Sequence, residues 1–532
     1  MGFFWNVYFI SKLVLFVRHT IGLNFGLNFG LALLLIVPLP LRWMRWLRQL
    51  LAIPAGAALL YYDSFLPSFA RVWSQVSNVG QFDSGYLLEL AARFVNPNAV
   101  VAAVVAMILL AVLGRWVRLS TFVMLALCGV PLWMQVQTLS TRMMTANAAA
   151  GAPVARSASS AATAGSVAVG NGSGFRPDAM LTAFFQQEAT RRVNFLTPSP
   201  EAPPDFDVIM LHICSLSWDD LDFAKQSNHP LLARFDVVFK NFSSAASYSG
   251  PAAIRVLRAG CGQQRHADLY QPAAPGCLLF EDLKQAGFVP QIAMNHDGRF
   301  DDFIGAVKAN FGVPNVVPMA TNGVAVGMRA FDDSPILDDY AVLSKWFATR
   351  QAAAPQPVAL YYNTISLHDG NRLPNNRASS METYPIRLKN LLDQVDRLET
   401  LISQSGRKAV LVFIPEHGGA THGDELQVAG LREIPTYAIS RVPVGVKLIG
   451  MTAANPVQKV IEAPSSYLAM AQLLANFVQK SPFTAGRDLN ELTKNLPTTD
   501  FVAENAETLV VRHDQTDWMR GPDGVWLEGG KK

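Results

Sequence analysis

The stretch Val208-Ile209-Met210-Leu211-His212-Ile213-Cys214 decides the fold of the second part of this chain. It is an almost unbroken apolar run with β-branched residues, and this pattern predicts a strand buried on both faces. Val358–Tyr362 and Ala409–Ile414 have the same character. An amphipathic helix is predicted between those two runs, because one of its faces carries Leu388, Leu391, Leu392, Val395, Leu398 and Ile402. Strands that alternate with helices predict an α/β domain whose mostly parallel sheet is sandwiched by helices.

The composition indicates a membrane-embedded part joined to a soluble part. Half of the 532 residues are hydrophobic and 16% are charged, whereas about 25% are charged in an average soluble protein. The formal net charge is only +3, and the sequence contains no long run of Lys and Arg. Nucleic-acid binding is therefore not expected.

The long apolar segments are confined to residues 1–137, which are predicted to form four or five transmembrane helices. Asn98–Gly114 is the clearest segment, because it carries no charge. Phe3–Val17 is the weakest, because Lys12 lies in its middle. For Phe3–Val17 and for the short Gln49–Tyr62, the alternative is a helix that lies in the membrane interface. The other two predicted spans are Thr20–Pro38 and Leu119–Gln137.

Two basic loops predict the orientation of these segments. Arg42, Arg45 and Arg48 lie between the second and third segments, and Arg115 and Arg118 lie between the fourth and fifth. Both loops should be cytoplasmic by the positive-inside rule. Everything after the fifth segment is then expected outside the cytoplasm.

The polar part of the chain is predicted to form one domain behind a linker. Residues 138–175 are rich in Ala, Ser, Gly and Thr and contain no acidic residue, so they are expected to be a flexible linker. Residues 176–532 carry the alternating strands and helices of the soluble domain. A C-terminal hairpin is expected at about residues 505–530, where a Gly-Pro-Asp-Gly sequence separates the apolar runs Leu509–His513 and Val525–Glu528.

Residues with metal-binding side chains follow the predicted strands. Cys214 ends the first strand, Glu416 and His417 follow the third, and His368 comes shortly after the second. Because the carboxyl ends of parallel strands meet at one edge of a sheet, these side chains are expected to converge. A thiolate, a carboxylate and an imidazole are donors that Zn²⁺ takes in tetrahedral geometry. Taken singly, each residue has an ordinary structural explanation, so the prediction rests on their convergence.

A serine at the start of a predicted helix is the candidate nucleophile. Ser249 precedes Pro251 and the predicted helix Ala252–Ala259. Its hydroxyl would lie at the helix N-terminus, where free N–H groups favour a phosphate anion. A metal bound to the same oxygen would lower the pKa of the hydroxyl and make it a better nucleophile. The alternative is a plain serine N-cap.

The pair Cys261 and Cys277 encloses a loop that contains Pro and Gly. In an external compartment a disulfide between them is expected. The alternative, two more zinc ligands, is less favoured because neither residue ends a predicted strand.

Five short motifs surround these candidates: Ile213–Trp218, Ser247–Arg255, Leu367–Asn371, Pro415–Gly419 and Gly430–Pro435. With the membrane part and the linker, they resemble the cellulose phosphoethanolamine transferases encoded with bacterial cellulose-secretion machinery. That family belongs to the alkaline-phosphatase superfamily, alongside the lipid A phosphoethanolamine transferases. The resemblance covers essentially the whole chain. It implies an alkaline-phosphatase-like catalytic domain in the periplasm and a multi-pass anchor in the bacterial inner membrane.

The resemblance also implies a mechanism and substrates. Cys214, Glu416 and His417 would hold Zn²⁺, with Ser249 completing the shell and carrying phosphoethanolamine as the nucleophile. The implied donor is phosphatidylethanolamine, and the implied acceptor is a glucosyl hydroxyl of cellulose, an exopolysaccharide of biofilms. Subunits of the cellulose synthase complex are the implied protein partners.

Three further residues receive roles from the same resemblance. His368 would contact the phosphoryl group or protonate a leaving group. Tyr248 and Arg432 would line the pocket, and Arg432 could pair with phosphate oxygens.

The chain also departs from the lipid A enzymes. They have Thr as the nucleophile, an acidic residue in place of Cys214, and Asp-His in place of Glu416 and His417. They carry a further metal-side His, for which His422 is the only nearby candidate, at a doubtful spacing. One firmly held zinc is therefore expected.

Other functions remain open at this stage. They are phosphoethanolamine transfer to another envelope glycan or lipid, a phosphodiesterase or sulfatase of the same fold, and a non-catalytic scaffold. A sulfatase is disfavoured because the sequence Cys261-Gly262-Gln263-Gln264-Arg265 lacks the Pro of the sulfatase motif.

Overall fold

The structure is a computed structural model of the chain. It describes residues 2–17, 21–64, 80, 82–93, 97–132, 175–195, 204–353, 355–424, 427–451, 458–484, 486–522 and 524–531. Nearly all of the predicted linker, residues 138–175, lies outside the described residues.

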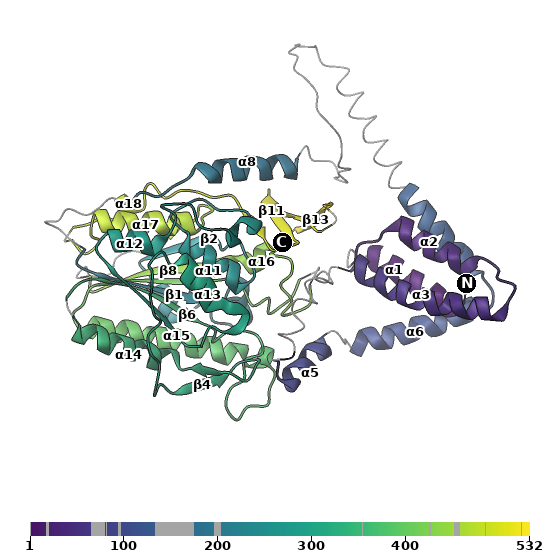
Figure 1. The fold of residues 1–532 in the computed structure, drawn as a ribbon, viewed down its shortest axis with the longest axis horizontal. Coiled ribbons are helices and arrows are strands. Elements are labelled where there is room, and N and C mark those ends of the chain that lie inside the picture. Colours follow the sequence, from purple (N-terminus) through teal and green to yellow (C-terminus); the bar gives the residue numbers. More distant parts are fainter. Residues whose placement is uncertain are drawn as a thin grey trace, which may run out of the picture. The chain divides into compact units, whose positions relative to one another are not determined.

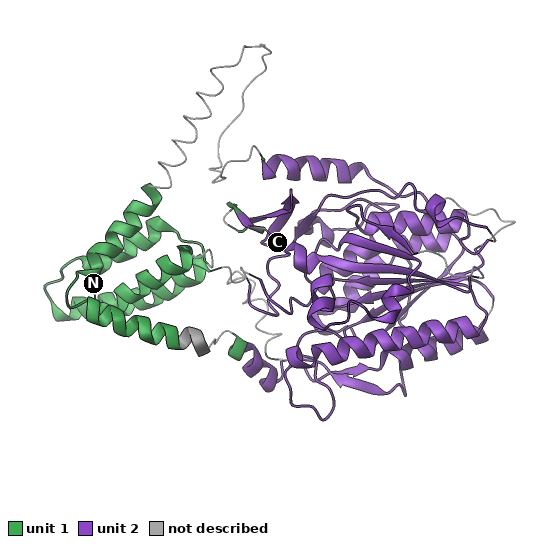
Figure 2. Cartoon of the chain, turned by 180° about the vertical axis from the view of Figure 1, so that it is seen from behind, with its two compact units in different colours: residues 1–73, 91–175, 521–527 green, residues 74–90, 176–520, 528–532 purple. Residues whose placement is uncertain are grey.

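The chain divides into two compact units (Figure 2). The first, here called the helical unit, comprises residues 1–73, 91–175 and 521–527. The second, the α/β unit, comprises residues 74–90, 176–520 and 528–532. The α/β unit thus contains a segment that comes before the linker in the sequence.

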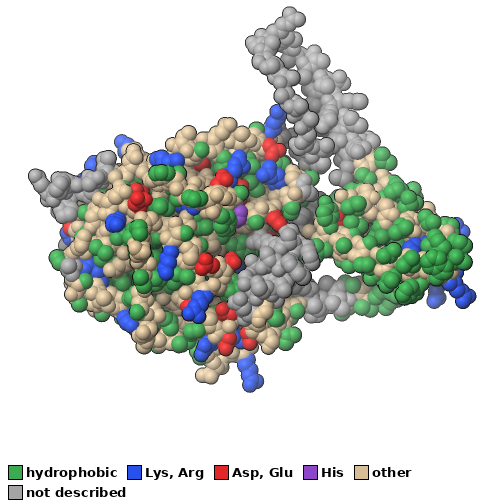
Figure 3. Space-filling model, viewed as in Figure 1, with side chains coloured by type: hydrophobic (Ala, Val, Ile, Leu, Met, Phe, Trp, Pro, Cys, Tyr) green, Lys and Arg blue, Asp and Glu red, His purple; other side chains and the backbone are tan. Residues whose placement is uncertain are grey.

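The helical unit contains five described helices. They are α1 (Phe3–Val17), α2 (Phe25–Ile36), α3 (Arg42–Asp63), α6 (Pro97–Leu113) and a helix over residues 119–132. Its core includes Phe9, Leu31, Ala32, Leu35, Ala52, Val123 and Leu127. Much of its visible surface is hydrophobic, whereas charged side chains are spread over the α/β unit (Figure 3). Among the described residues, no helix combines the length and the hydropathy of a membrane span.

The charge that weakens the first apolar segment is buried and paired. Lys12 is 1% exposed, and its Nζ lies 2.5 Å from Asp63 Oδ2. It also donates to Asn28 Oδ1 at 2.9 Å. Helix α1 can therefore bury Lys12, because α3 supplies a carboxylate and α2 supplies an amide.

The α/β unit is built on a seven-stranded sheet in the order β3-β6-β1-β7-β8-β2-β9 (Figure 1). All pairings are parallel except those of β8, which runs antiparallel to both neighbours. The prediction of a mostly parallel sheet is confirmed, and the antiparallel β8 is an addition to it. The strands are β1 (Asp207–Ile213), β2 (Val237–Ser243), β3 (Val289–Met294), β6 (Val358–Thr364), β7 (Ala409–Pro415), β8 (Arg441–Ile449) and β9 (Lys459–Ile461).

Helices cover both faces of this sheet, and each face has its own hydrophobic core (Figure 1). One face packs against α11 (Ser249–Leu257), α12 (Leu279–Gln285), α13 (Phe303–Asn310) and α17 (Tyr467–Gln479). The other packs against α9 (Trp218–Phe223), α10 (Pro230–Ala233), α14 (Asp339–Ala352) and α15 (Ser380–Gln404). Both faces of β1 and β7 are therefore dry, which explains their apolar sequences.

Shorter elements complete the description. The helices are α5 (Ser84–Arg93), α8 (Pro177–Thr190), η1 (His266–Tyr270), η2 (Phe300–Asp302), α16 (Tyr437–Ser440) and α18 (Leu489–Leu492). A two-stranded sheet joins β4 (Val326–Arg329) and β5 (Pro335–Leu337). The C-terminal sheet consists of β10 (Val502–Glu504), β11 (Leu509–His513), β12 (Thr516–Arg520) and β13 (Trp526–Lys531), in that order.

The C-terminal sheet differs from the expected hairpin in its turn. β11 pairs with β12 rather than with the run at Val525–Glu528. Asp514 and Gln515 form the turn, with φ angles of 46° and 63°. The expected turn at Gly521–Gly524 lies between β12 and β13 instead. Asp-Gln carries no glycine, so its left-handed backbone gave little signal in the sequence.

Candidate metal centre and nucleophile

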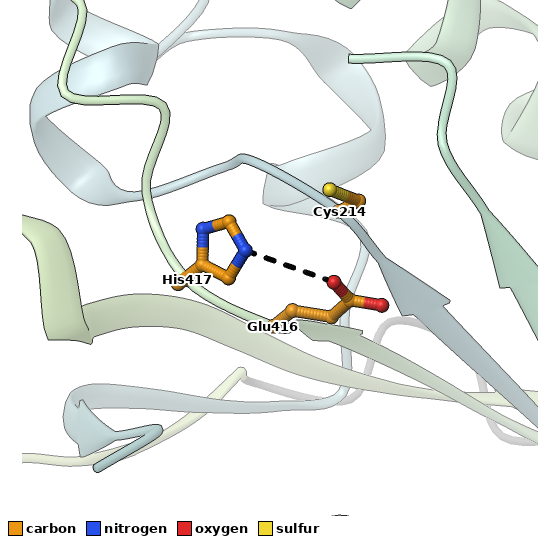
Figure 4. A group of neighbouring side chains, drawn as sticks. All are labelled: Cys214, Glu416 and His417. Atoms are coloured by element: carbon orange, nitrogen blue, oxygen red, sulfur yellow. Dashed lines mark ion pairs between the residues drawn. The ribbon is translucent and has the colours of Figure 1, made fainter. Parts of the chain in front are cut away.

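The sheet register brings Cys214, Glu416 and His417 together. β1 and β7 are parallel and pair Ile213 with Pro415, so the residues that follow leave the sheet side by side. All three side chains are fully buried. Figure 4 shows them pointing toward one another. Their ligand atoms all lie within 4.8 Å of one another.

Ser249 supplies a fourth donor to this cluster. Its Oγ lies 3.4 Å from Cys214 Sγ and 3.4 Å from His417 Nε2. His417 Nε2 lies 3.8 Å from Glu416 Oε2. Two donors on one tetrahedral zinc, each about 2.0–2.3 Å from it, are separated by roughly 3.3–3.8 Å. The four donors thus have the spacing of a tetrahedral shell.

The position of Ser249 follows from the helix that begins there. Helix α11 starts at Ser249, and its N-cap is Tyr248, which makes no side-chain capping bond. Ser249 is therefore the first helical residue and not the N-cap, which removes the plain N-cap explanation. Its Oγ lies beside the free N–H groups of the first helical turn.

Burial determines the charge state of the three ligands. It raises the pKa of the Cys214 thiol to about 12 and that of the Glu416 carboxyl to about 7. It lowers the pKa of His417 well below its usual value. Glu416 Oε2 is buried without a hydrogen-bond partner. A dry cluster of S, O and N donors with an orphaned carboxylate oxygen fits a divalent cation, which would supply the missing charge.

Hydrogen bonds orient two of these ligands. His417 Nδ1 lies 2.8 Å from the Gly418 carbonyl oxygen, which can only accept, so the Nδ1 proton is fixed and Nε2 keeps its lone pair. Asn363 Nδ2 donates to Glu416 Oε1 at 2.6 Å, and His212 Nδ1 lies 3.5 Å from the same oxygen. His296 in turn contacts Asn363 Oδ1 at 2.8 Å. Our sequence analysis missed Asn363, His212 and His296 as site residues, because their partners lie on other strands.

The loop after β6 carries His368 in a defined tautomer. His368 Nδ1 lies 2.6 Å from the backbone oxygen of Asp369, so Nδ1 carries the proton and Nε2 is the proton acceptor. Burial is the main cause that lowers the pKa of His368 to about 4, and the positive charge of Arg432 adds to it. The ring is therefore neutral at neutral pH. This geometry favours a base over the predicted proton donor.

Arg432 and Tyr248 lie beside the cluster. Arg432 Nη1 donates to Ser215 Oγ at 3.1 Å and lies 3.2 Å from His417 Nδ1. Its guanidinium is 5.6 Å from the centre of the Tyr248 ring. Tyr248 Oη donates to Glu433 Oε1 at 2.5 Å. The guanidinium thus places a positive charge next to the candidate metal ligands.

Other candidates are kept apart from the cluster. His422 is half exposed, and its Nδ1 lies 2.9 Å from Asp219 Oδ2. Cys261 and Cys277 form a disulfide, whereas Cys214 is free. Within the described ranges, Cys214, Glu416 and His417 are the one group of three such side chains with metal-ligand spacing.

The fold and the site define an α/β protein with a candidate metal centre beside a helix-terminal serine. The sequence comparisons give the family. A model of the "Cellulose biosynthesis protein BcsG C-terminal domain" matches residues 162–526, and one of the N-terminal domain matches residues 5–132. This chain belongs to the BcsG family of cellulose biosynthesis proteins.

Full-length relatives support this assignment. The Cellulose biosynthesis protein BcsG of Salmonella typhimurium is 37% identical over 98% of this chain and 95% of its own length. That of Escherichia coli K12 is 38% identical, with the same coverage of both chains.

Two solved structures share the fold at low identity. One is a protein in the alkaline phosphatase superfamily from Vibrio parahaemolyticus, with a TM-score of 0.46, 13% identity, and coverage of 67% of this chain and 88% of that one. The other is the integral membrane protein lipooligosaccharide phosphoethanolamine transferase A from Neisseria meningitidis, with a TM-score of 0.40, 12% identity, and coverage of 85% and 95%. At these identities the likeness concerns the fold alone.

The bond from Asn363 to Glu416 yields a test of the metal centre. Asn363→Ala is expected to weaken zinc binding about ten- to hundredfold, because Glu416 loses the amide that orients it. Zinc affinity of the full-length protein is measured by equilibrium dialysis in zinc buffers. The matched control is Asn310→Ala, a buried amide that accepts from Arg258. Equal zinc affinity in Asn363→Ala and the control would contradict the assignment.

Proposed function

We propose that this chain transfers phosphoethanolamine from phosphatidylethanolamine to glucosyl hydroxyls of cellulose, with Zn²⁺ as cofactor and Ser249 as covalent carrier. The observation that carries the proposal is the position of Ser249 Oγ, 3.4 Å from both Cys214 Sγ and His417 Nε2 at the start of α11. The name of the relatives, cellulose biosynthesis protein, supports a role with that polymer. The motif resemblance supports phosphoethanolamine as the transferred group.

Cys214, Glu416 and His417 would hold the zinc ion. When bound, zinc would lower the pKa of the Ser249 hydroxyl and neutralise charge on the phosphoryl group. The three ligands would be fixed before substrate arrives, because the sheet and the bonds from Asn363 and Gly418 already orient them.

In the first step, Ser249 Oγ would attack the phosphorus of the lipid. The new Oγ–P bond forms as the bond from phosphorus to the diacylglycerol oxygen breaks, and the serine proton ends on that oxygen. Diacylglycerol leaves, and phosphoethanolamine remains on Ser249. The N–H groups at the start of α11 and the guanidinium of Arg432 would stabilise the negative charge of the phosphoryl group.

In the second step, a glucan hydroxyl would attack the same phosphorus. His368 Nε2 would accept the proton of that hydroxyl, since its Nδ1–H is already engaged with the Asp369 carbonyl. The new bond joins phosphorus to the glucan oxygen, and Ser249 Oγ regains a proton as it leaves. Because the pKa of His368 is about 4, the ring is ready as a base throughout the physiological range.

The helical unit would anchor the enzyme in the bacterial inner membrane, with the α/β unit in the periplasm. The basic loops at residues 42–48 and 115–118 support this orientation. The exposed apolar side chains of the helical unit support contact with lipid, for example Leu51, Ile53 and Ile108. This location would give access to a lipid donor and to subunits of the cellulose synthase complex.

The carrier role of Ser249 has a direct test. Ser249→Ala should abolish transfer and adduct formation, because no oxygen remains to attack phosphorus, while three of the four zinc donors stay in place. The full-length protein is incubated with a phosphoethanolamine donor, and the adduct is mapped by peptide mass spectrometry. Ser247→Ala is a neighbouring serine control. An adduct on Ser243, Ser244 or Ser247, or full activity in Ser249→Ala, would refute the role.

The acceptor is tested by product analysis. Exopolysaccharide from cells with this protein should show aminoethyl phosphate on cellulose by solid-state NMR, and cells with Ser249→Ala should not. Unmodified cellulose in both cases, together with phosphoethanolamine on another glycan or lipid, would reassign the acceptor.

The orientation is tested with a C-terminal fusion. A reporter that fluoresces only in the cytoplasm should stay dark after Lys532, and the same reporter after Arg45 should be bright. A bright fusion at Lys532 would overturn the proposed topology.

A further inference from the structure

Residues 82–90, here called the docking segment, lie between α3 and α6 in the sequence but belong to the α/β unit. Backbone and side-chain bonds hold the segment there. Asp83 N donates to the Phe331 carbonyl at 2.9 Å, and Asp83 Oδ2 pairs with Arg372 Nη1 at 2.6 Å. Glu89 accepts from the backbone N–H of Ser380 at 3.1 Å. The segment therefore binds both ends of the loop that follows β6.

Tyr86 reaches the centre of that loop. Its side chain is buried, and its Oη donates to Asp369 Oδ2 at 3.2 Å. Gly370 has a φ of +81°, and a Cβ there would come within 2.8 Å of the Tyr86 ring and 2.6 Å of Phe331. The loop thus approaches Tyr86 so closely that only glycine fits between them.

The same contacts fix the ring of His368. Phe331 packs on His368 with ring centroids 4.9 Å apart. Phe82 of the docking segment packs edge-on against Phe331 at 5.3 Å. The Asp369 backbone oxygen, which sets the tautomer of His368, belongs to the residue whose side chain Tyr86 holds. Both supports of the imidazole therefore contact the docking segment.

We propose that the docking segment positions His368, so that a loop between two apolar helices forms part of the catalytic apparatus. The proposal rests on the proposed function for the role of His368 as base. Tyr86 is a positioning residue, because it acts through Asp369 and Phe331. The supports of Ser249 and of the metal ligands described above come from β1, β6, β7 and α11. Loss of Tyr86 should therefore slow the second step and spare the first.

The test compares the two steps in the full-length protein. The donor is p-nitrophenyl phosphoethanolamine, whose leaving group gives a coloured burst as Ser249 is modified. Discharge of the adduct is then followed with a soluble cello-oligosaccharide. Tyr86→Ala should discharge about tenfold more slowly, with unchanged burst rate and zinc content. Tyr86→Phe keeps the ring and should lose only a part of that factor.

A matched control lies on the same helix. Leu88 is 73% exposed, so Leu88→Ala changes helix α5 without touching the loop and should discharge at the normal rate. Tyr86→Ala in a His368→Ala background should add little further loss, because both changes act on one function. Normal discharge in Tyr86→Ala, or parallel loss of burst, zinc and discharge, would overturn the proposal.

Hydrogen exchange separates this proposal from the proposed function. Tyr86→Ala should speed amide exchange in residues 365–372, whereas Leu88→Ala should not. If the wild-type protein forms no Ser249 adduct, the proposed function fails, and the exchange measurement still decides the structural part. Unchanged exchange in Tyr86→Ala would show that the segment does not hold the loop, and would overturn the inference.

Discussion

The parallel pairing of β1 with β6 on one side and β7 on the other is the constraint on which the site depends. The register sets Ile213 opposite both Thr364 and Pro415, so three chain segments leave the sheet at one edge. Cys214 and Glu416 come next along their strands and have little freedom to move apart. The same edge receives Ser249, because β2 is also parallel to β7 through the intervening antiparallel β8. A shift of one residue in the β1–β7 pairing would turn these side chains to the opposite face.

Burial is the second element of the design. It raises the pKa of Cys214 and Glu416 and lowers that of His417, so each group resists its charged form when it stands alone. The same dryness makes the cluster a strong cation site, since a positive ion satisfies all its donors together. Asn363 adds direction, because its amide occupies one oxygen of Glu416 and leaves the other facing His417.

The sequence was informative where the chemistry is adjacent to a local pattern. Buried strands are visible as apolar runs, so the residues that end them could be named, and Pro251 marked the helix that begins at Ser249. Asn363 and His212 could not be singled out, because they lie inside strands and their role comes from cross-strand register. Strand β8 contains Pro443 and Gly445, which weaken a strand pattern. Tyr86 carries no local signal of its contact with Asp369.

The position of His368 explains why distant segments gather around it. The metal-ligand candidates follow their strands directly, so the sheet itself holds them. His368 lies further beyond the end of β6, where no neighbouring strand can fix the backbone. Arg387 of α15 therefore donates to the carbonyl oxygens of Ser366 and His368 from one side. Tyr86 and Phe331 close the loop from elsewhere in the unit. The further a catalytic side chain lies from the sheet, the more its placement depends on elements that the sheet does not organise.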